Sequence, residues 1–216
     1  MARASKKPAG RSLYSVHPGV VMMQKWIAEL KDKTGRSLDE WIVLVKTEGP
    51  DDEKACRAWL KEAHGLGTNS AWWIAERALA RDDKGINEDD PESYLKAAEV
   101  YVEEMYAGAK AGLRPIYDAL LTLGLGIGPE AKACPCQTIV PLYRNHVFAQ
   151  IKPTTRTRID LGLALGDTPA TGRLVATGGL AKGDRITLRV PITALADIDA
   201  EVEQLLRAAY DRDARG

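Results

Sequence analysis

The chain has 216 residues, 45% of them hydrophobic and 28% charged, and its 30 basic and 30 acidic side chains give a formal net charge of zero. This composition is typical of a globular protein and excludes a disordered chain. The apolar runs are too short to cross a bilayer, which takes about 20 consecutive residues, and the basic first residues lead into no apolar signal segment. Three cysteines make no disulfide framework. We therefore expect a cytoplasmic protein with no membrane partner.

The neutral total hides a segregated charge pattern. Residues 82–104 carry an excess of 7 acidic side chains, whereas residues 105–190 carry an excess of 6 basic ones. All five tryptophans come before residue 74, and alternating β-branched residues come almost only after residue 130. The expected organisation is a basic flexible tail over residues 1–16, a four-helix domain over 17–81, an acidic linker over 82–93 and an α+β domain over 94–216.

Four short helices are predicted in the first domain. The first begins at Pro18 and ends before Gly35, and the second runs from about residue 38 to 48. Ser37 and Glu40 have the spacing of a capping box, in which each side chain accepts a backbone N–H at the helix start. The candidate caps of the third and fourth helices are Asp51 or Asp52, and Thr68, Asn69 or Ser70.

The second domain is predicted to be α+β, an antiparallel sheet flanked by helices. One helix is expected from Pro91 to about Gly108. Another is expected over about 113–123, with the glycines of the run 124–128 breaking it, and a last amphipathic helix over about 198–210. The predicted strands cover about 137–143, 145–152, 156–163, 171–177 and 185–191.

Both domains resemble families of unknown function. The runs 34–41 and 59–67 resemble the domain of unknown function numbered 4287, over about residues 17–80. Tyr143-Arg144, the runs 148–153 and 159–163, and the stretch from Asp199 to Tyr210 resemble the domain of unknown function numbered 5655, over about residues 95–213. The resemblance implies a compact α+β module that also occurs attached to larger bacterial proteins, some of them nuclease-like. It transfers no catalytic residue, because neither family has an established activity.

Cys134-Pro135-Cys136 is the candidate for a metal or redox site. Two thiols that are two residues apart on an extended segment point to the same side. A structural zinc site takes four ligands, however, and Cys134 and Cys136 supply two. The glycine-rich run 124–128 lacks the preceding strand that a dinucleotide fingerprint requires. We therefore expect neither a metal nor a cofactor, and we interpret the cysteines as two small side chains where a strand begins.

Basic residues alternate along two predicted strands that follow each other in the sequence. Side chains two residues apart share a face of a strand, and the tight connection over 153–155 makes these two strands neighbours. A sheet with one wet side carries polar residues there in any case, which is the simpler interpretation. The shared faces hold Arg144, His146, Phe148, Gln150 and Lys152 on the first strand, and Arg156, Arg158 and Asp160 on the second.

The functional hypothesis is that this face binds an anion. Guanidinium and ammonium groups pair with phosphates, and an aromatic ring offers a stacking plane to a base. The candidate residues are Arg144, Lys152, Arg156 and Arg158 for charge, and Tyr143 and Phe148 for stacking. If the later strands pack alongside, the face is extended by Arg173, Lys182, Arg185 and Arg189.

The sequence thus favours a non-catalytic binding or accessory module that contacts an anionic ligand, such as nucleic acid or a phosphorylated small molecule. One alternative is an enzyme with a pocket between the domains, although the chain has no nucleophile elbow and no His-Glu-x-x-His motif. The other is a structural protein whose tryptophan-rich helices dock a protein partner or a second copy of the chain. Salt-sensitive retention on a polyanion matrix favours the first hypothesis, and perturbed acids in a deep pocket favour the enzyme.

Overall fold

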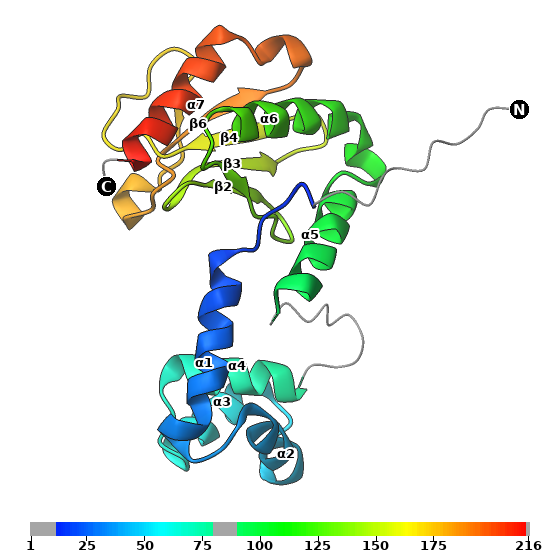
Figure 1. The fold of residues 1–216 in the computed structure, drawn as a ribbon, viewed down its shortest axis with the longest axis vertical. Coiled ribbons are helices and arrows are strands. Elements are labelled where there is room, and N and C mark those ends of the chain that lie inside the picture. Colours follow the sequence, from blue (N-terminus) through cyan, green and yellow to red (C-terminus); the bar gives the residue numbers. More distant parts are fainter. Residues whose placement is uncertain (1–11, 80–89, 215–216) are drawn as a thin grey trace, which may run out of the picture. The chain divides into compact units, whose positions relative to one another are not determined.

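The computed structural model describes residues 12–79 and 90–214, which form two compact units (Figure 1). The first unit comprises Pro18–Tyr94, and the second combines the residues from Leu95 onward with the segment that precedes Pro18. The predicted α+β class is confirmed, because helices come first and a six-stranded antiparallel sheet with helices follows. Within these residues, each helix is too short or too polar to span a membrane.

The first unit contains α1 (Pro18–Thr34), α2 (Leu38–Glu48), α3 (Glu53–Glu62) and α4 (Thr68–Leu79), where the apolar periodicity predicts them. The capping box of α2 is confirmed. The backbone N–H of Glu40 donates to the Ser37 hydroxyl, and the Glu40 carboxylate accepts the Ser37 N–H at 2.6 Å. Asp52 caps α3 by accepting the N–H of Ala55 at 2.9 Å.

The core of the first unit includes Trp41, whose side chain is almost completely buried. Its indole N–H donates to the Thr34 hydroxyl at 2.9 Å, so burial of the ring leaves its one polar group satisfied. The ring of His64 meets those of Trp41 and Trp59 edge-on. Around them pack Leu30, Val45, Cys56, Leu60, Leu66, Ala71, Ile74, Ala75 and Ala78.

The helices that lead into the second unit are α5 (Pro91–Met105), the 3-10 helix η1 (Gly108–Leu113) and α6 (Arg114–Gly126). The predicted break at the glycines is wrong, because α6 continues through Gly124 and Gly126. A Cβ atom on Gly124 would lie 2.5 Å from the Leu142 side chain. The glycine therefore lets the helix approach the sheet closely. Glycine makes a helix less stable than alanine does, but here it does not end the helix.

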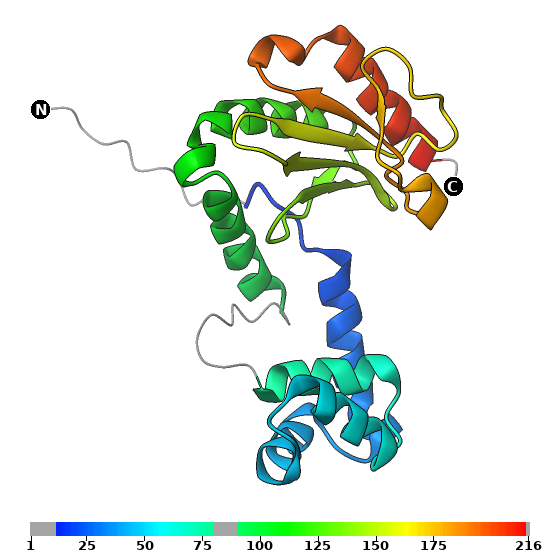
Figure 2. The same cartoon turned by 180° about the vertical axis from the view of Figure 1, so that it is seen from behind.

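Six strands form one antiparallel sheet in the order β1-β2-β3-β4-β6-β5. Helices α6 and α7 (Ala200–Asp213) lie over the same face of this sheet (Figures 1 and 2). The covered face is formed by fully buried apolar side chains such as Leu142, Ile151 and Leu161. The strands are β1 (Lys132–Ala133), β2 (Val140–Tyr143), β3 (Val147–Pro153), β4 (Ile159–Leu163), β5 (Val175–Ala176) and β6 (Leu188–Ile192). Two further 3-10 turns are η2 (Leu180–Lys182) and η3 (Leu195–Asp197).

A β-bulge interrupts the pairing of β2 with β3. Leu142 pairs with Ala149, but the next residue, Tyr143, pairs with Val147, so Phe148 is the extra residue on β3. An extra residue breaks the regular alternation of side chains. Phe148 is consequently buried, and its ring meets that of Tyr210 on α7 edge-on, with centroids 5.3 Å apart. The prediction that Phe148 shares the polar face is wrong, because simple alternation ignores the bulge.

The segment of residues 12–17 is bound to the second unit. The backbone N–H of Ser15 donates to the carbonyl of Ala133 on the edge strand β1 at 2.8 Å. The hydroxyl groups of Tyr14 and Tyr117 lie 3.0 Å apart. An exposed strand edge has unpaired backbone groups, and this segment satisfies one of them.

The structure therefore differs from the expected tail over residues 12–16, which are hydrogen-bonded to β1 and α6. The rest of that expected tail, residues 1–11, and residues 82–89 of the expected acidic linker lie outside the described residues. The division of the chain near residues 82–93 stays a prediction.

Replacing Ser37 by alanine removes the acceptor of the capping box. We expect the free energy of unfolding of the first unit to fall by about 0.5–2 kcal/mol. All tryptophans lie between Trp26 and Trp73, so tryptophan fluorescence during urea titration reports on this unit. Ser37→Asp keeps a capping oxygen and serves as the matched control. Equal stability of Ser37→Ala and the wild type would show that the cap contributes nothing.

A chain that begins at residue 18 lacks the segment that is bound to β1. We expect the second unit to lose about 1–3 kcal/mol of unfolding free energy, the equivalent of a few hydrogen bonds. Because this unit has no tryptophan, near-ultraviolet circular dichroism of its tyrosines is the measurement. A chain that begins at residue 12 is the control, and identical stability of the two shortened chains would contradict the structural role of residues 12–17.

Candidate functional site

The sheet face opposite α6 and α7, called the outer face below, carries polar side chains in two rows. Register places Gln150 on β3 next to Gly162 on β4, which is paired in turn with Arg189 on β6. In the second row, Lys152 on β3 is paired with Asp160 on β4. Because side chains alternate along each strand, these residues all project away from the apolar core. Lys152 on β3 and Arg189 on β6 thus lie on the two strands that flank Asp160.

Asp160 orients two arginines on the outer face. Its carboxylate, which is about 10% exposed, accepts a hydrogen bond from Arg189 at 2.6 Å and one from the Thr154 hydroxyl at 2.7 Å. The Nε atom of Arg158 lies 3.0 Å from the other carboxylate oxygen. A charge this buried is tolerated when it is paired and hydrogen-bonded. One carboxylate therefore holds two guanidinium groups, both partly exposed.

A hollow of about 350 Å³ lies over this arrangement. We call it the central hollow. Its charged lining consists of three cations and one carboxylate, so it keeps an excess of two positive charges. The side chains that line it include Gln150, Lys152, Thr154, Arg158, Asp160 and Arg189. The structure thus brings together Lys152 and Arg158 of the predicted set and adds Arg189, which the sequence had named as an extension.

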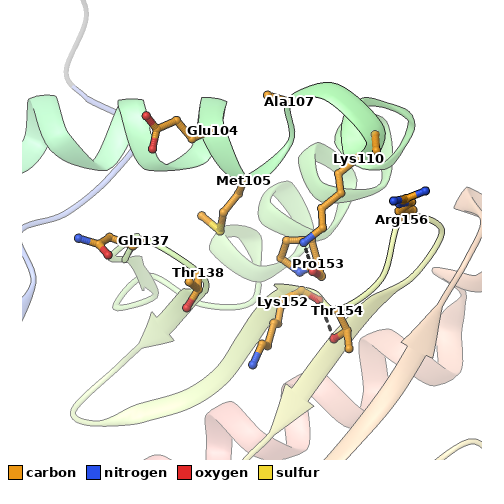
Figure 3. A pocket seen from close by; sticks show the side chains of 11 residues that line it. Glu104, Met105, Ala107, Lys110, Gln137, Thr138, Lys152, Pro153, Thr154 and Arg156 are labelled. Carbon is orange, nitrogen blue, oxygen red and sulfur yellow. Dashed lines mark hydrogen bonds between the residues drawn. The ribbon is translucent and has the colours of Figure 1, made fainter. Parts of the chain in front are cut away.

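A second hollow, of about 650 Å³, adjoins the central one at the end of β3 (Figure 3). We call it the helix-side hollow, because α5 and η1 form one wall. Lys110 reaches across it and donates to the carbonyl of Pro153 at 2.7 Å. Arg156, another member of the predicted set, is exposed at its rim. Lys152 and Thr154 line both hollows, so the two hollows lie side by side.

Arg144 does not join this group. It lies in the turn between β2 and β3, at the opposite end of β3 from Lys152, and forms an ion pair with Glu130 at 2.6 Å. Its guanidinium stacks over the Tyr210 ring at 4.3 Å from the centroid. These contacts hold Arg144 beside α7, so the structure does not support its predicted role in the anion site.

Tyr143 is also engaged elsewhere. Its hydroxyl lies 3.0 Å from the Nε2 atom of His17, and the two rings meet edge-on. Burial raises the pKa of the Tyr143 hydroxyl to about 12. Since Phe148 is in the core, neither aromatic residue of the predicted set offers a stacking plane on the outer face.

The two cysteines of the Cys-Pro-Cys run lie next to β1, and neither forms a disulfide within the described residues. Cys134 is buried, and its thiol donates to the carbonyl of Val16 at a sulfur–oxygen distance of 3.7 Å. Burial raises the pKa of Cys134 to about 12, so the thiolate that metals and oxidants need is disfavoured. Across residues 12–79 and 90–214, no three side chains of His, Cys, Asp or Glu are arranged to hold a metal ion.

The sequence analysis did not predict a group of hydrogen-bond donors around one carboxylate near the C-terminus, that of Asp213. Asp213 is almost fully buried and accepts the backbone N–H groups of Asn145 and His146 at 2.8 and 2.9 Å. Its second oxygen lies 3.2 Å from His146 Nδ1 and accepts a hydrogen bond from Arg185 at 2.6 Å. This group ties the end of α7 to the β2–β3 turn. Only a folded chain brings these distant residues together, so no local pattern signals it.

Comparison with known families matches each unit separately. The family described as "Domain of unknown function (DUF5655)" matches residues 102–213, about half of the chain. The chain belongs to this family. The family described as "Domain of unknown function (DUF4287)" matches residues 22–79, within the four-helix unit. Both predicted resemblances are confirmed, and neither family description states an activity. Curated proteins and solved structures gave no match.

Asp213 also makes the stability of the second unit depend on pH. Burial alone would raise the pKa of this carboxyl, but the N–H groups of His146 and Asn145, the His146 side chain and the Arg185 guanidinium together lower it. A lowered pKa in the folded state means that the carboxylate stabilises the fold above its unfolded pKa of about 3.9. This contribution is lost as the pH falls through the folded pKa.

Asp213→Asn removes the charge and one strong acceptor. We expect the free energy of unfolding of the second unit to fall by about 1–3 kcal/mol at neutral pH. We also expect this free energy to depend less on pH below about 4. Urea titrations between acid and neutral pH, followed by circular dichroism, measure both effects. Asp211→Asn, on an exposed neighbour in the same helix, is the control. A variant as stable as the control at neutral pH would contradict the role assigned to Asp213.

Proposed function

We propose that the second unit is a non-catalytic binding module that holds a phosphate-bearing anion in the central hollow. The observation that carries the proposal is the convergence of Lys152, Arg158 and Arg189 around the single carboxylate of Asp160. Three cations against one anion leave the hollow attractive to negative charge, and the low-dielectric sheet beneath it focuses the field.

The two arginines are already oriented for a ligand. Asp160 and the sheet restrict their side chains, so binding an anion costs less conformational entropy than it would on a free surface. A guanidinium has five N–H donors, and the contacts with Asp160 occupy a minority of them. The remaining donors suit the oxygens of a phosphate, with the exposed ammonium of Lys152 as a third contact.

The same geometry supports binding over catalysis. Asp160 contacts two guanidinium groups and a hydroxyl, so its carboxylate oxygens are engaged in contacts within the sheet face. Both oxygens of Asp213 are likewise occupied by donors. We further propose that the protein acts in the cytoplasm, because the described cysteines form no disulfide, which fits a reducing compartment.

Lys152→Glu tests the proposal directly. Lys152 is exposed on the outer face, so we expect the reversal to leave the fold intact and to lower the salt concentration at which the protein elutes from heparin. Lys46→Glu, at an exposed position on α2, changes the net charge equally and is the matched control. If both variants elute at the same salt concentration, the retention comes from net charge alone and the central hollow is not the site.

A further inference from the structure

A third hollow continues the outer face beyond the central one. It has a volume of about 380 Å³ and is lined by Val147, Gln150, Thr177, Lys182, Asp184 and Arg185, among others. We call it the loop-side hollow. Gln150 and Thr177 line both this hollow and the central one, just as Lys152 and Thr154 line the central and helix-side hollows. The three hollows are therefore neighbours along one surface, which we call the basic track.

The basic track follows β3. The loop-side hollow is lined by Val147, near the start of the strand, and the helix-side hollow is lined by Pro153, at its end. Seven residues at about 3.3 Å each make a path of roughly 20 Å. Lys110 and Arg156 extend it at the helix side. A ligand that fills the track is consequently elongated, and a single phosphate group occupies only a part of it.

Positive charge is spread over the whole length of the track. Each hollow contributes at least two cations, and the three hollows together have seven basic and three acidic residues in their lining. The basic residues are Lys110, Lys152, Arg156, Arg158, Lys182, Arg185 and Arg189. Arg185 is also paired with Asp213, outside the lining, which leaves an overall excess of three positive charges. Regularly repeated negative charge on an extended ligand matches this distribution.

We propose that the basic track binds single-stranded nucleic acid along β3 through its phosphates. The inference rests on the proposed function, because it assigns the ligand of the central hollow and extends the site on both sides. A single strand is thin enough to lie along neighbouring hollows, whereas a duplex presents a wide convex surface and is read by elements that enter its grooves. The amide of Gln150 supplies a further hydrogen-bonding group along the path. The hydroxyls of Thr154 and Thr177 instead donate to Asp160 and to the Ile186 carbonyl, which holds them in place beside it.

The lining also predicts how selective the binding is. None of the described residues that line the three hollows is aromatic. Proteins that bind single strands commonly add base stacking to backbone contacts, and stacking carries much of their affinity. Here the phosphates carry the contact, so binding depends strongly on salt and weakly on base sequence.

The test uses the full chain and fluorescence anisotropy of labelled oligothymidylates. We expect a strand of about twelve nucleotides, longer than the track, to bind at least about tenfold more tightly than one of about three. Arg156→Ala and Lys182→Ala remove exposed cations from opposite ends of the track. Each should weaken binding of the long strand by about fivefold, the effect of one exposed ion pair. Each should also reduce the salt slope by about 0.7. Lys46→Ala is the control.

The outcomes separate this inference from the proposed function. If the short strand binds as tightly as the long one and only Lys152→Glu weakens binding, the ligand is confined to the central hollow, and the single-strand track is wrong while the anion site stands. A duplex of the same length that binds as tightly as the single strand overturns the choice of ligand. If neither oligothymidylates nor inorganic tripolyphosphate binds, both the track and the anion site are wrong.

Discussion

In the described part of the second unit, α6 and α7 cover one face of the sheet, and this constraint determines which side chains are available for function. Alternate apolar residues of β2, β3, β4 and β6, such as Leu142, Ile151 and Leu161, form the face covered by α6 and α7, so the intervening residues project on the outer face. A carboxylate on that face, Asp160, is still nearly buried, because Arg158, Arg189 and Thr154 gather around it. A buried charge is costly without such partners. The requirement to neutralise Asp160 therefore assembles the cations that make the face attractive to anions.

Local signals in the sequence predicted α1 to α4 well. They failed for features that depend on contacts between residues far apart in the sequence, such as the strand β1 and the bulge at Phe148. The capping box at Ser37 and the apolar periodicity of α1 to α4 act within a few residues, so they can be recognised without the fold. The two-residue strand β1 has no pattern of its own and exists because β2 pairs with it. Phe148 was misplaced because a bulge is a property of two paired strands. Gly124 was misread as a helix end because its partner, Leu142, lies on another element.

The candidate site was predictable in part for the same reason. Alternation along β3 and β4 placed Lys152 and Arg158 on one face, and the antiparallel register confirms that their strands are neighbours. The importance of Arg189 depends on the strand order, because β6 inserts beside β4 although β5 precedes it in the sequence. Arg144 shows the opposite case: its position in the sequence suggested the outer face, but the β2–β3 turn brings it to Glu130 and Tyr210. The residue types show which side chains can bind an anion, and the strand pairing determines which of these side chains lie together on the outer face.

The chain order gives the four-helix unit an unusual connection to the second unit. The segment 12–17 is hydrogen-bonded to β1 and α6, yet it precedes α1, so the first unit is inserted within the chain of the second. This segment lies outside the residues 102–213 that match the DUF5655 family, and outside the residues 22–79 that match the other family. The edge of β1 thus receives a backbone partner that the matched region does not itself contain. A single cut between α4 and α5 would leave this segment on the fragment that carries the four-helix unit, so the sheet would lose a backbone partner that belongs to its own unit.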